Sequence, residues 1–285
     1  METNSDKKHV NLIDPDAPLM KGKKGNFDTN YNIQAACGED EVITFCDVTQ
    51  KGNDKVQLIP SLKGIMKNTG KQIKIVLADA DYGTFDSLEY MKQNKMIGYV
   101  PYRDMNTTFE EKPFHQVHFL YDQKLDCYSC PNGKKLNYYH TSHDKKRNQF
   151  YRQYRVDCLQ TCKDCPFMDK CVPKKAARRI IKRETRQHLK DEMKIRLNSK
   201  HGRNMYKKRL HPIESFFGHI KYNLGYTRFL LRSLDKVKAE FTLICLSFNL
   251  PKLIAKLTCL LVLIWQIGPF KQSENKIKTL SPICQ

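Results

Sequence analysis

A cysteine-rich and highly charged stretch from residue 105 to residue 209 most constrains how this chain folds. It holds six of the 11 cysteines and little periodic apolar pattern, so we expect an insertion stapled by its own metal site. Cysteines two residues apart suit tetrahedral zinc, because each short turn presents two sulfurs to one ion. The six candidates are Cys127, Cys130, Cys158, Cys162, Cys165 and Cys171. Spacing alone does not choose four of them, and His140 and His143 compete as ligands.

Strand-like and helix-like patterns alternate on both sides of this stretch. We expect strands over residues 9–14, 31–37, 42–48, 73–79 and 97–100, and helices over 56–67, 85–94, 214–222 and 234–249. A hairpin turn at Gly38-Glu-Asp40 is expected to join the second and third strands. This order predicts an α/β fold, a mixed sheet flanked by helices. The predicted divisions are 1–104 as the first part of the main domain, 105–209 as the insertion, 210–253 as its last helices, and 254–285 as an apolar tail of unknown role.

The charge of the chain predicts a polyanionic partner. Fifty lysines and arginines face 30 acids, a net charge of +20, so nucleic acid is the expected partner and an anionic membrane is not. The run from Leu257 to Ile267 has eleven residues and is too short to span a bilayer. The polar start shows no secretory signal, so we expect a cytoplasmic protein with reduced thiols.

Three carboxylates are candidates for a magnesium site. Asp14 and Asp79 each end a strand-like run, and Glu214 lies on a predicted helix seven residues before Lys221. Two magnesium or manganese ions on such acids neutralise the attacking and leaving oxygens of a phosphodiester. Asp16 is the alternative first acid. Each acid alone is more often a turn, cap or surface residue.

Several segments together resemble the DDE transposases of bacterial insertion sequences. These segments are Asp14-Pro-Asp-Ala-Pro-Leu-Met20, Tyr31-Asn-Ile-Gln-Ala-Ala36, Leu77-Ala-Asp-Ala-Asp-Tyr82 and the run from His211 to Asn249. The most similar piece begins with Glu214-Ser-Phe-Phe-Gly-His-Ile-Lys221. The resemblance covers most of residues 9–253.

The resemblance implies a ribonuclease H-like fold with Asp, Asp and Glu on metal. Asp14 or Asp16 is then the first acid, Asp79 the second and Glu214 the third, and the protein cleaves and transfers DNA strands as a dimer near the bacterial nucleoid. It also implies a structural zinc on Cys130, Cys162, Cys165 and Cys171, with Cys127 and Cys158 as alternatives.

Two departures from the family pattern are visible. Asp81 stands where the family usually has glycine, and the sequence starts almost at the first acid, whereas family members begin with a long helical region. A truncated, catalytically inactive protein that binds zinc and DNA is therefore the alternative.

Basic residues gather before and after Glu214. Residues 174–209 hold 15 lysines and arginines against three acids, which indicates either a phosphate-binding surface or a solvated charged face. The candidate DNA contacts are Lys207, Lys208, Arg209, Lys221, Arg228 and Arg232.

Overall fold

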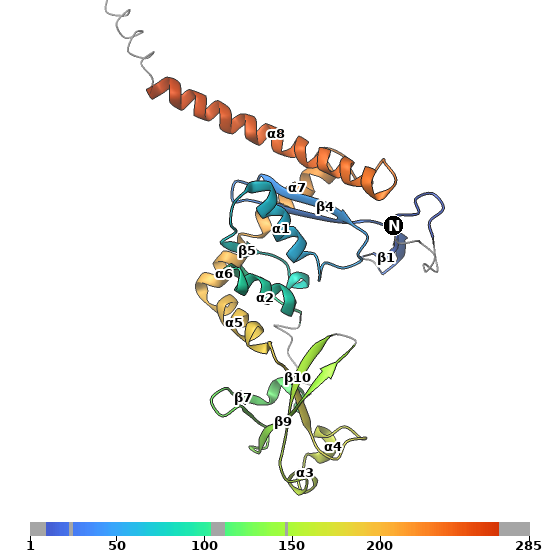
Figure 1. Ribbon diagram of the computed structural model, residues 1–285, viewed down its shortest axis with the longest axis vertical. Helices are drawn as coiled ribbons and strands as arrows, with labels where there is room; N and C mark the ends of the chain where they lie inside the picture. Colours follow the sequence, from blue (N-terminus) through green and yellow to red (C-terminus); the bar gives the residue numbers. More distant parts are fainter. Residues whose placement is uncertain (1–9, 23–24, 104–111, 146–147, 268–285) are drawn as a thin grey trace, which may run out of the picture. The chain divides into compact units, whose positions relative to one another are not determined.

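The computed structural model divides the chain into two compact units. Unit 1 comprises residues 1–77 and 204–285, and unit 2 comprises residues 78–203. The structure describes residues 10–22, 25–103, 112–145 and 148–267 (Figure 1).

Unit 1 contains short hairpins and a long final helix. Its elements are β1 (Leu19–Lys21), β2 (Phe27–Thr29), β3 (Asn32–Cys37), β4 (Ile43–Thr49), α1 (Leu58–Thr69), β5 (Ile75–Leu77), α7 (Leu210–Gly218), the π-helical turn η4 (His219–Asn223) and α8 (Leu234–Ile267). The helix α6 (Lys200–Lys207) includes the boundary between the units.

Strands β3 and β4 form the central hairpin of unit 1. They pair antiparallel, from Asn32 opposite Thr49 at the open end to Cys37 opposite Ile43 beside the turn. The turn is closed by the Gly38 N–H, which donates to the Val42 carbonyl at 3.0 Å. The two predicted strands and the turn between them are confirmed.

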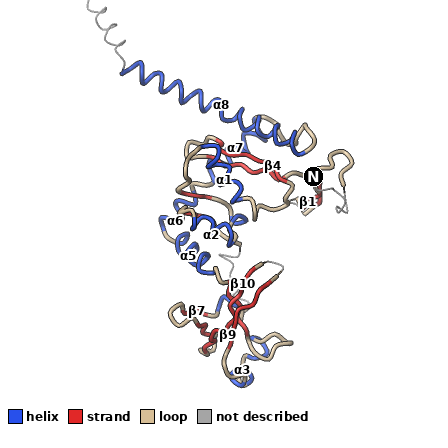
Figure 2. Tube along the Cα trace, viewed as in Figure 1, coloured by secondary structure: helices blue, strands red, loops and turns tan. Residues whose placement is uncertain are grey.

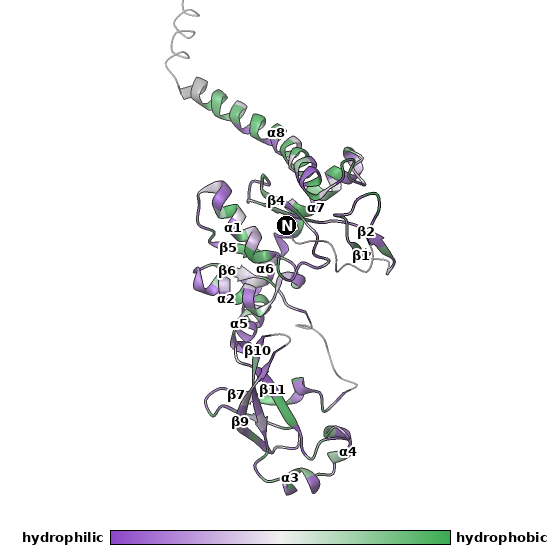
Figure 3. Cartoon of the chain, turned by 45° about the vertical axis from the view of Figure 1, so that its right-hand side comes forward, coloured by the Kyte–Doolittle hydropathy of each residue, from purple (hydrophilic) through white to green (hydrophobic). Residues whose placement is uncertain are grey.

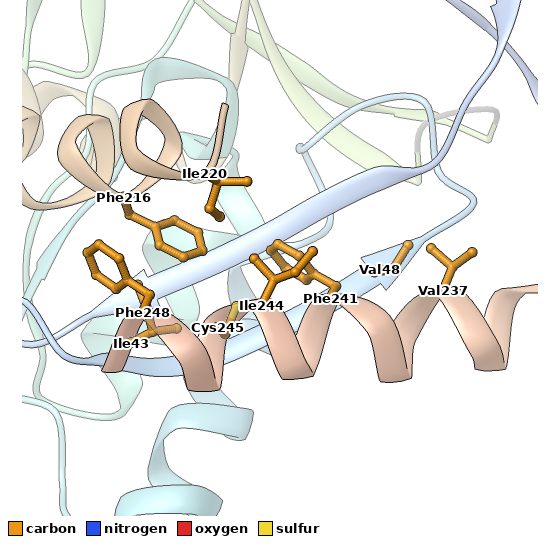
Figure 4. Close-up of a cluster of buried hydrophobic side chains, with 9 residues drawn as sticks. All are labelled: Ile43, Val48, Phe216, Ile220, Val237, Phe241, Ile244, Cys245 and Phe248. Atoms are coloured by element: carbon orange, nitrogen blue, oxygen red, sulfur yellow. The ribbon is translucent and has the colours of Figure 1, made fainter. Parts of the chain in front are cut away.

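The first half of α8 supplies the core of unit 1. Its buried side chains recur three or four residues apart and therefore share one helix face. This face packs against β4 and α7 (Figure 4). The buried set is Ile43, Val48, Phe216, Ile220, Val237, Phe241, Ile244, Cys245 and Phe248. Removing one such large apolar side chain from water stabilises the fold by about 1.5–3 kcal/mol.

Helix α8 extends well beyond the expected end at residue 249. It runs to Ile267 through Pro251, and Leu234–Leu263 is long and apolar enough to cross a membrane by length and composition (Figure 3). The eleven-residue apolar run from Leu257, taken alone in the sequence, is too short to span a bilayer. The helix that contains this run is longer and passes the length and composition criteria. One face of its first half packs inside unit 1, since Val237, Phe241 and Phe248 are buried in the core of that unit.

Unit 2 is built on a five-stranded antiparallel sheet (Figure 2). The strand order is β11-β10-β9-β8-β7. The elements are η2 (Ala80–Tyr82), α2 (Phe85–Gln93), β6 (Ile97–Tyr99), η3 (Gln116–His118), β7 (Leu120–Asp122), β8 (Cys127–Ser129), β9 (Lys135–Asp144), β10 (Gln149–Arg155), α3 (Gln160–Lys163), α4 (Met168–Cys171), β11 (Ile180–Glu184) and α5 (Gln187–Asn198).

A tyrosine cluster fixes the sheet of unit 2 around one acid. The carboxylate of Asp126 accepts hydrogen bonds from the hydroxyls of Tyr121 at 2.8 Å and Tyr154 at 2.7 Å, and it pairs with Arg152. The side chain of Tyr154 is fully buried. Desolvation and the hydrogen bond to Asp126 raise the pKa of Tyr154, so its hydroxyl stays a donor at neutral pH.

The α/β class is confirmed, with differences in detail. Residues 10–14 of the predicted first strand form no strand, and His9 lies outside the described residues. The predicted strand over 73–79 shortens to β5. No parallel pair of strands occurs within either unit among the described residues, so the mixed sheet is not seen inside a single unit.

Candidate functional site

Asp79 stands directly before a tight turn in unit 2. It follows β5 by two residues, and its backbone carbonyl accepts from the Tyr82 N–H at 3.1 Å to open η2. Its side chain is exposed. The neighbouring Asp81 forms an ion pair with Arg103 at 2.7 Å, so the extra charge at this position is neutralised by a partner in the same unit.

Gly83 fixes the loop that carries Asp79. A Cβ atom on Gly83 would lie 1.9 Å from the Pro101 carbonyl oxygen, far inside contact distance. The turn after Asp79 therefore packs directly on backbone, and only glycine fits there. Helix α2 begins next, where the Thr84 hydroxyl accepts from the Ser87 N–H at 3.2 Å.

Glu214 projects from α7 into solvent. Two residues later Phe216 is fully buried against the aromatic rings of α8, so the helix turns Phe216 inward and Glu214 outward. Among the described residues, no side chain pairs with the Glu214 carboxylate. Lys221 is also exposed.

Lys221 lies within the π-helical turn η4, whereas Glu214 lies in α7. The Leu224 N–H donates to the His219 carbonyl at 3.0 Å, a five-residue step. Such turns displace the side chains that follow from regular α-helical register. The predicted helix is confirmed, although Glu214 and Lys221 lie in turns of different geometry.

Asp14 holds the start of α8. One carboxylate oxygen accepts from the Ser233 N–H at 3.2 Å and the other accepts from the Tyr31 hydroxyl at 2.9 Å. The side chain is 8 % exposed. Desolvation and this hydrogen bond to Asp14 raise the pKa of Tyr31. Asp16 is half-buried, and one of its oxygens accepts from the Leu234 N–H at 3.1 Å.

The structure does not bring Asp14 or Asp16 together with Glu214. Both aspartates contact the first residues of α8, whereas Phe216 of α7 packs on Phe248 with ring centroids 5.0 Å apart. Phe248 lies fourteen positions along the helix from Leu234, roughly 20 Å at 1.5 Å per residue.

Contacts with the two ends of the β3–β4 hairpin also place Asp14 apart from α7, the helix that carries Glu214. Tyr31, which binds Asp14, precedes the open end, while His211 at the start of α7 pairs at 2.8 Å with Glu41 beside the turn. The predicted pocket that joins the first acid to Glu214 is therefore not formed within unit 1. The physical reason is that both aspartates are used as hydrogen-bond acceptors at the N-terminus of α8.

Four cysteines of unit 2 line one small cavity. Its volume is about 30 Å³, and its walls include Cys130, Cys162, Cys165 and Cys171. The Cys130 sulfur accepts from the Lys134 N–H at 3.3 Å, a contact typical of a sulfur held in a tight turn. These are the four cysteines that the family resemblance favours.

The two alternative cysteines lie outside this wall. Cys127 is buried in β8, and Cys158 is exposed. In the part of the chain that the structure describes, no three His, Cys, Asp or Glu side chains are grouped closely enough to hold a metal ion. The sulfurs thus surround one space without being gathered to ligand distance.

Many arginines of the basic stretch are internal contacts of unit 2. Arg183 pairs with Asp191 at 2.6 Å, and Arg186 pairs with Asp86, Glu89 and Glu184. Two more donate to backbone carbonyls: Arg178 to Val156 and Arg179 to Phe114. These four arginines therefore stabilise unit 2 and are engaged by protein partners, which differs from a continuous phosphate-binding surface.

The candidate DNA contacts outside unit 2 are differently placed. Lys207, Lys208, Lys221, Arg228 and Arg232 are exposed, and Arg209 is half-buried with its guanidinium 5.1 Å from the Tyr206 ring centroid. These side chains lie where a polyanion has access to them.

Comparison with known protein families identifies a relationship for the segment that includes Glu214. Residues 129–254 match the family model described as "Transposase DDE domain". This match supports a DDE transposase. The matched segment includes Glu214, the four cavity cysteines and the half of α8 that forms the core. No curated protein and no solved structure matches the chain.

The sequence patterns did not predict one buried acid of the matched segment, Glu240. Glu240 is 8 % exposed and accepts from the N–H groups of Leu230, at 2.9 and 3.1 Å, and of Leu231, at 2.8 Å. A signal was present, because Glu240 falls between Val237 and Phe241 on the apolar face of the predicted helix. A charge at such a position needs partners.

Proposed function

We propose that the chain is the catalytic part of a DNA transposase that cleaves and transfers the strands of a bacterial insertion sequence. The observation that carries this proposal is the transposase DDE match over residues 129–254, which includes Glu214. A ribonuclease H-like arrangement and a homodimer on DNA belong to the same proposal. The positive charge of +20 supports DNA as the partner.

Asp79 and Glu214 are the proposed metal-binding acids. Both side chains are exposed at the ends of short structured segments, and carboxylate oxygens are ligands that suit magnesium or manganese. Two such ions, when bound, neutralise the charge on the attacking and leaving oxygens. Catalysis then requires both carboxylates at the same phosphodiester.

Asp14 and Asp16 are assigned mainly to the start of α8. Asp14 has both oxygens engaged by protein donors. Asp16 has one oxygen engaged by a backbone donor and is half-buried. Asp16 is therefore the better first acid of the two if the triad assembles with DNA.

The proposed reaction is two successive displacements at phosphorus. A water oxygen attacks the scissile phosphate, the P–O3′ bond breaks, and a 3′ hydroxyl and a 5′ phosphate result. The 3′ hydroxyl then attacks a phosphate of the target, forming a new P–O bond and releasing the target's own 3′ oxygen. Lys221 and Arg228 contribute charge for phosphate binding, so the protein acts mainly by positioning and electrostatics.

A structural zinc in unit 2 is the second part of the proposal. Four thiols around one cavity match the ligand chemistry of zinc, and such a metal would stabilise a segment that has a small core. Cys130, Cys162, Cys165 and Cys171 are the proposed ligands, in place of Cys127 and Cys158.

One observation favours a second candidate function. Neither Asp14 nor Asp16 lies beside Glu214, so a DNA-binding protein without catalysis fits the contacts of unit 1. Nicking of supercoiled plasmid by the purified protein with magnesium or manganese separates the two. Metal-dependent nicking supports the transposase, whereas DNA binding without nicking in either metal supports the inactive form.

A further inference from the structure

Three carboxylates hold the backbone of one short loop. Residues 228–234 connect the η4 region to α8, and the N–H groups of Leu230 and Leu231 donate to Glu240. The N–H of Ser233 donates to Asp14, and that of Leu234 donates to Asp16. Four consecutive or near-consecutive amides are therefore satisfied by side-chain acids instead of by regular secondary structure.

The conformation of the loop needs this support. Ser233 has a φ of 72°, in the left-handed region that non-glycine residues rarely adopt. Such a conformation costs on the order of 1 kcal/mol and persists where surrounding contacts determine it. The hydrogen bond from Ser233 to Asp14 is one such contact.

An aromatic anchor fixes the middle of the loop. The ring of Phe229 packs edge-on against Tyr31, with centroids 6.4 Å apart, and against Phe241 at 6.3 Å. Tyr31 also donates to Asp14. The Phe229 side chain thus joins the loop to the core, and the backbone amides join the loop to the acids.

Arg228 and Arg232 lie on either side of Phe229 in the sequence, and both side chains are exposed. Neither arginine pairs with a described side chain. The carboxylates of Asp14, Asp16 and Glu240 instead accept from the backbone amides of nearby loop residues. The acids bind the amides and leave the guanidinium groups available. A fixed backbone with unpaired charges loses little entropy when it meets an anion.

We propose that Asp14 and Glu240 are positioning residues that present Arg228 and Arg232 to two phosphates of the DNA backbone. This inference rests on the proposed function for its partner, and it assigns Asp14 to DNA positioning instead of metal binding. Arginine suits the role because its planar donors fit phosphate oxygens.

A double-mutant cycle on DNA affinity tests the proposal. The full chain is titrated against a 30-base-pair duplex in magnesium-free buffer over a range of potassium chloride concentrations. Arg228→Gln with Arg232→Gln is expected to reduce the slope of log K against log salt by about 2, since each lost phosphate contact removes about one counterion. Affinity near 0.1 M salt should fall by on the order of tenfold.

Glu240→Ala should reproduce this loss without removing any positive charge. Added to the arginine double variant it should have no further effect, because it acts through the same two side chains. Glu240→Gln and Asp14→Asn, which keep a carbonyl oxygen for the amides, should retain most of the affinity. Asp235→Asn, at an exposed acid in the first turn of α8, is the matched control.

Each result decides the matter. Independent, additive losses from Glu240→Ala and the arginine variants would overturn the proposal, as would unchanged binding in the arginine double variant or no binding by the wild-type chain. Circular dichroism and thermal unfolding of every variant separate loss of the loop from loss of the fold. Plasmid nicking by the same preparations is read separately, so absent nicking with intact coupling would refute only the transposase proposal.

Discussion

The Asp14 carboxylate accepts a hydrogen bond from the Ser233 N–H at 3.2 Å, joining residues 219 positions apart. The contact places the Asp14-Pro-Asp16 segment at the N-terminus of α8, where carboxylates satisfy amides that lack helical partners and interact favourably with the helix dipole. It also places the segment away from Glu214, because α7 packs near Phe248. One contact thus explains both the burial of Asp14 and its separation from Glu214.

Phe216→Ala should destabilise unit 1 strongly. The Phe216 ring is fully buried and lies 5.0 Å from the Phe248 centroid and 6.3 Å from that of Phe241. Truncation leaves a cavity at a junction of three elements and should cost about 3–5 kcal/mol. Urea unfolding measures it, with Tyr222→Ala, at an 86 % exposed site, as the control expected to change stability by less than about 0.5 kcal/mol. Equal stability of the two variants would contradict this core.

Gly83→Ala should disturb the turn that follows Asp79. The added Cβ meets the Pro101 carbonyl oxygen at 1.9 Å, so backbone must move, and we expect a loss of at least about 2 kcal/mol. Gly218→Ala is the matched control, since a Cβ there meets nothing within 4 Å and alanine favours the helix by up to about 1 kcal/mol. Thermal unfolding of both variants checks this, and a neutral Gly83→Ala would disprove the close approach.

The zinc proposal predicts unequal effects among six cysteines. Serine at Cys130, Cys162, Cys165 or Cys171 should remove bound zinc and lower the melting temperature of unit 2, because these thiols line one cavity. Cys158→Ser, at an exposed position, should leave one zinc per chain. Metal analysis by mass spectrometry reads the outcome. Zinc loss in Cys158→Ser but not in Cys162→Ser would exclude the proposed ligands.

Cys46 should be an unusually reactive thiol above neutral pH. Its hydrogen bond with Cys245 lowers the pKa of Cys46 to about 7, whereas burial raises the pKa of Cys37 to about 11. The thiolate of Cys46 therefore forms as pH rises through 7, while Cys37 stays protonated until far higher pH. At pH 8 iodoacetamide should modify Cys46 at least about tenfold faster than Cys37, as peptide mass spectrometry would show. Faster modification of Cys37 would contradict the contact.

Sequence patterns predicted the parts of the fold that are governed by local periodicity. The helix containing Val237, Phe241, Ile244 and Phe248 and the hairpin around Gly38 follow from spacing and turn residues. The five-stranded sheet of unit 2 was missed, because its few buried apolar residues are spread over many charged positions and two of its core side chains, Tyr128 and Tyr154, carry hydroxyls. Tyr154 is buried only because Asp126 satisfies its hydroxyl, a partner 28 positions away.

The candidate site shows the same division between local and distant contacts. Glu214 and the four cysteines are recognisable from short motifs, and the transposase DDE match includes them. The role of Asp14 depends on Ser233 and Tyr31, and no local pattern around Asp14 contains either partner. Aspartate is common both at strand ends and at helix N-termini, so the sequence around Asp14 does not distinguish these two roles and only the fold does.

The most direct test of the account is metal-dependent plasmid nicking by Asp79→Asn and Glu214→Gln proteins, with Asp235→Asn as a control at another exposed acid. Both substitutions remove the charge of a proposed metal ligand while keeping its size, so nicking in manganese should fall at least about 10²-fold with unchanged thermal unfolding. Asp235→Asn should nick as the wild type does. Wild-type nicking rates in folded Asp79→Asn and Glu214→Gln proteins would contradict the assignment of these two acids to catalysis.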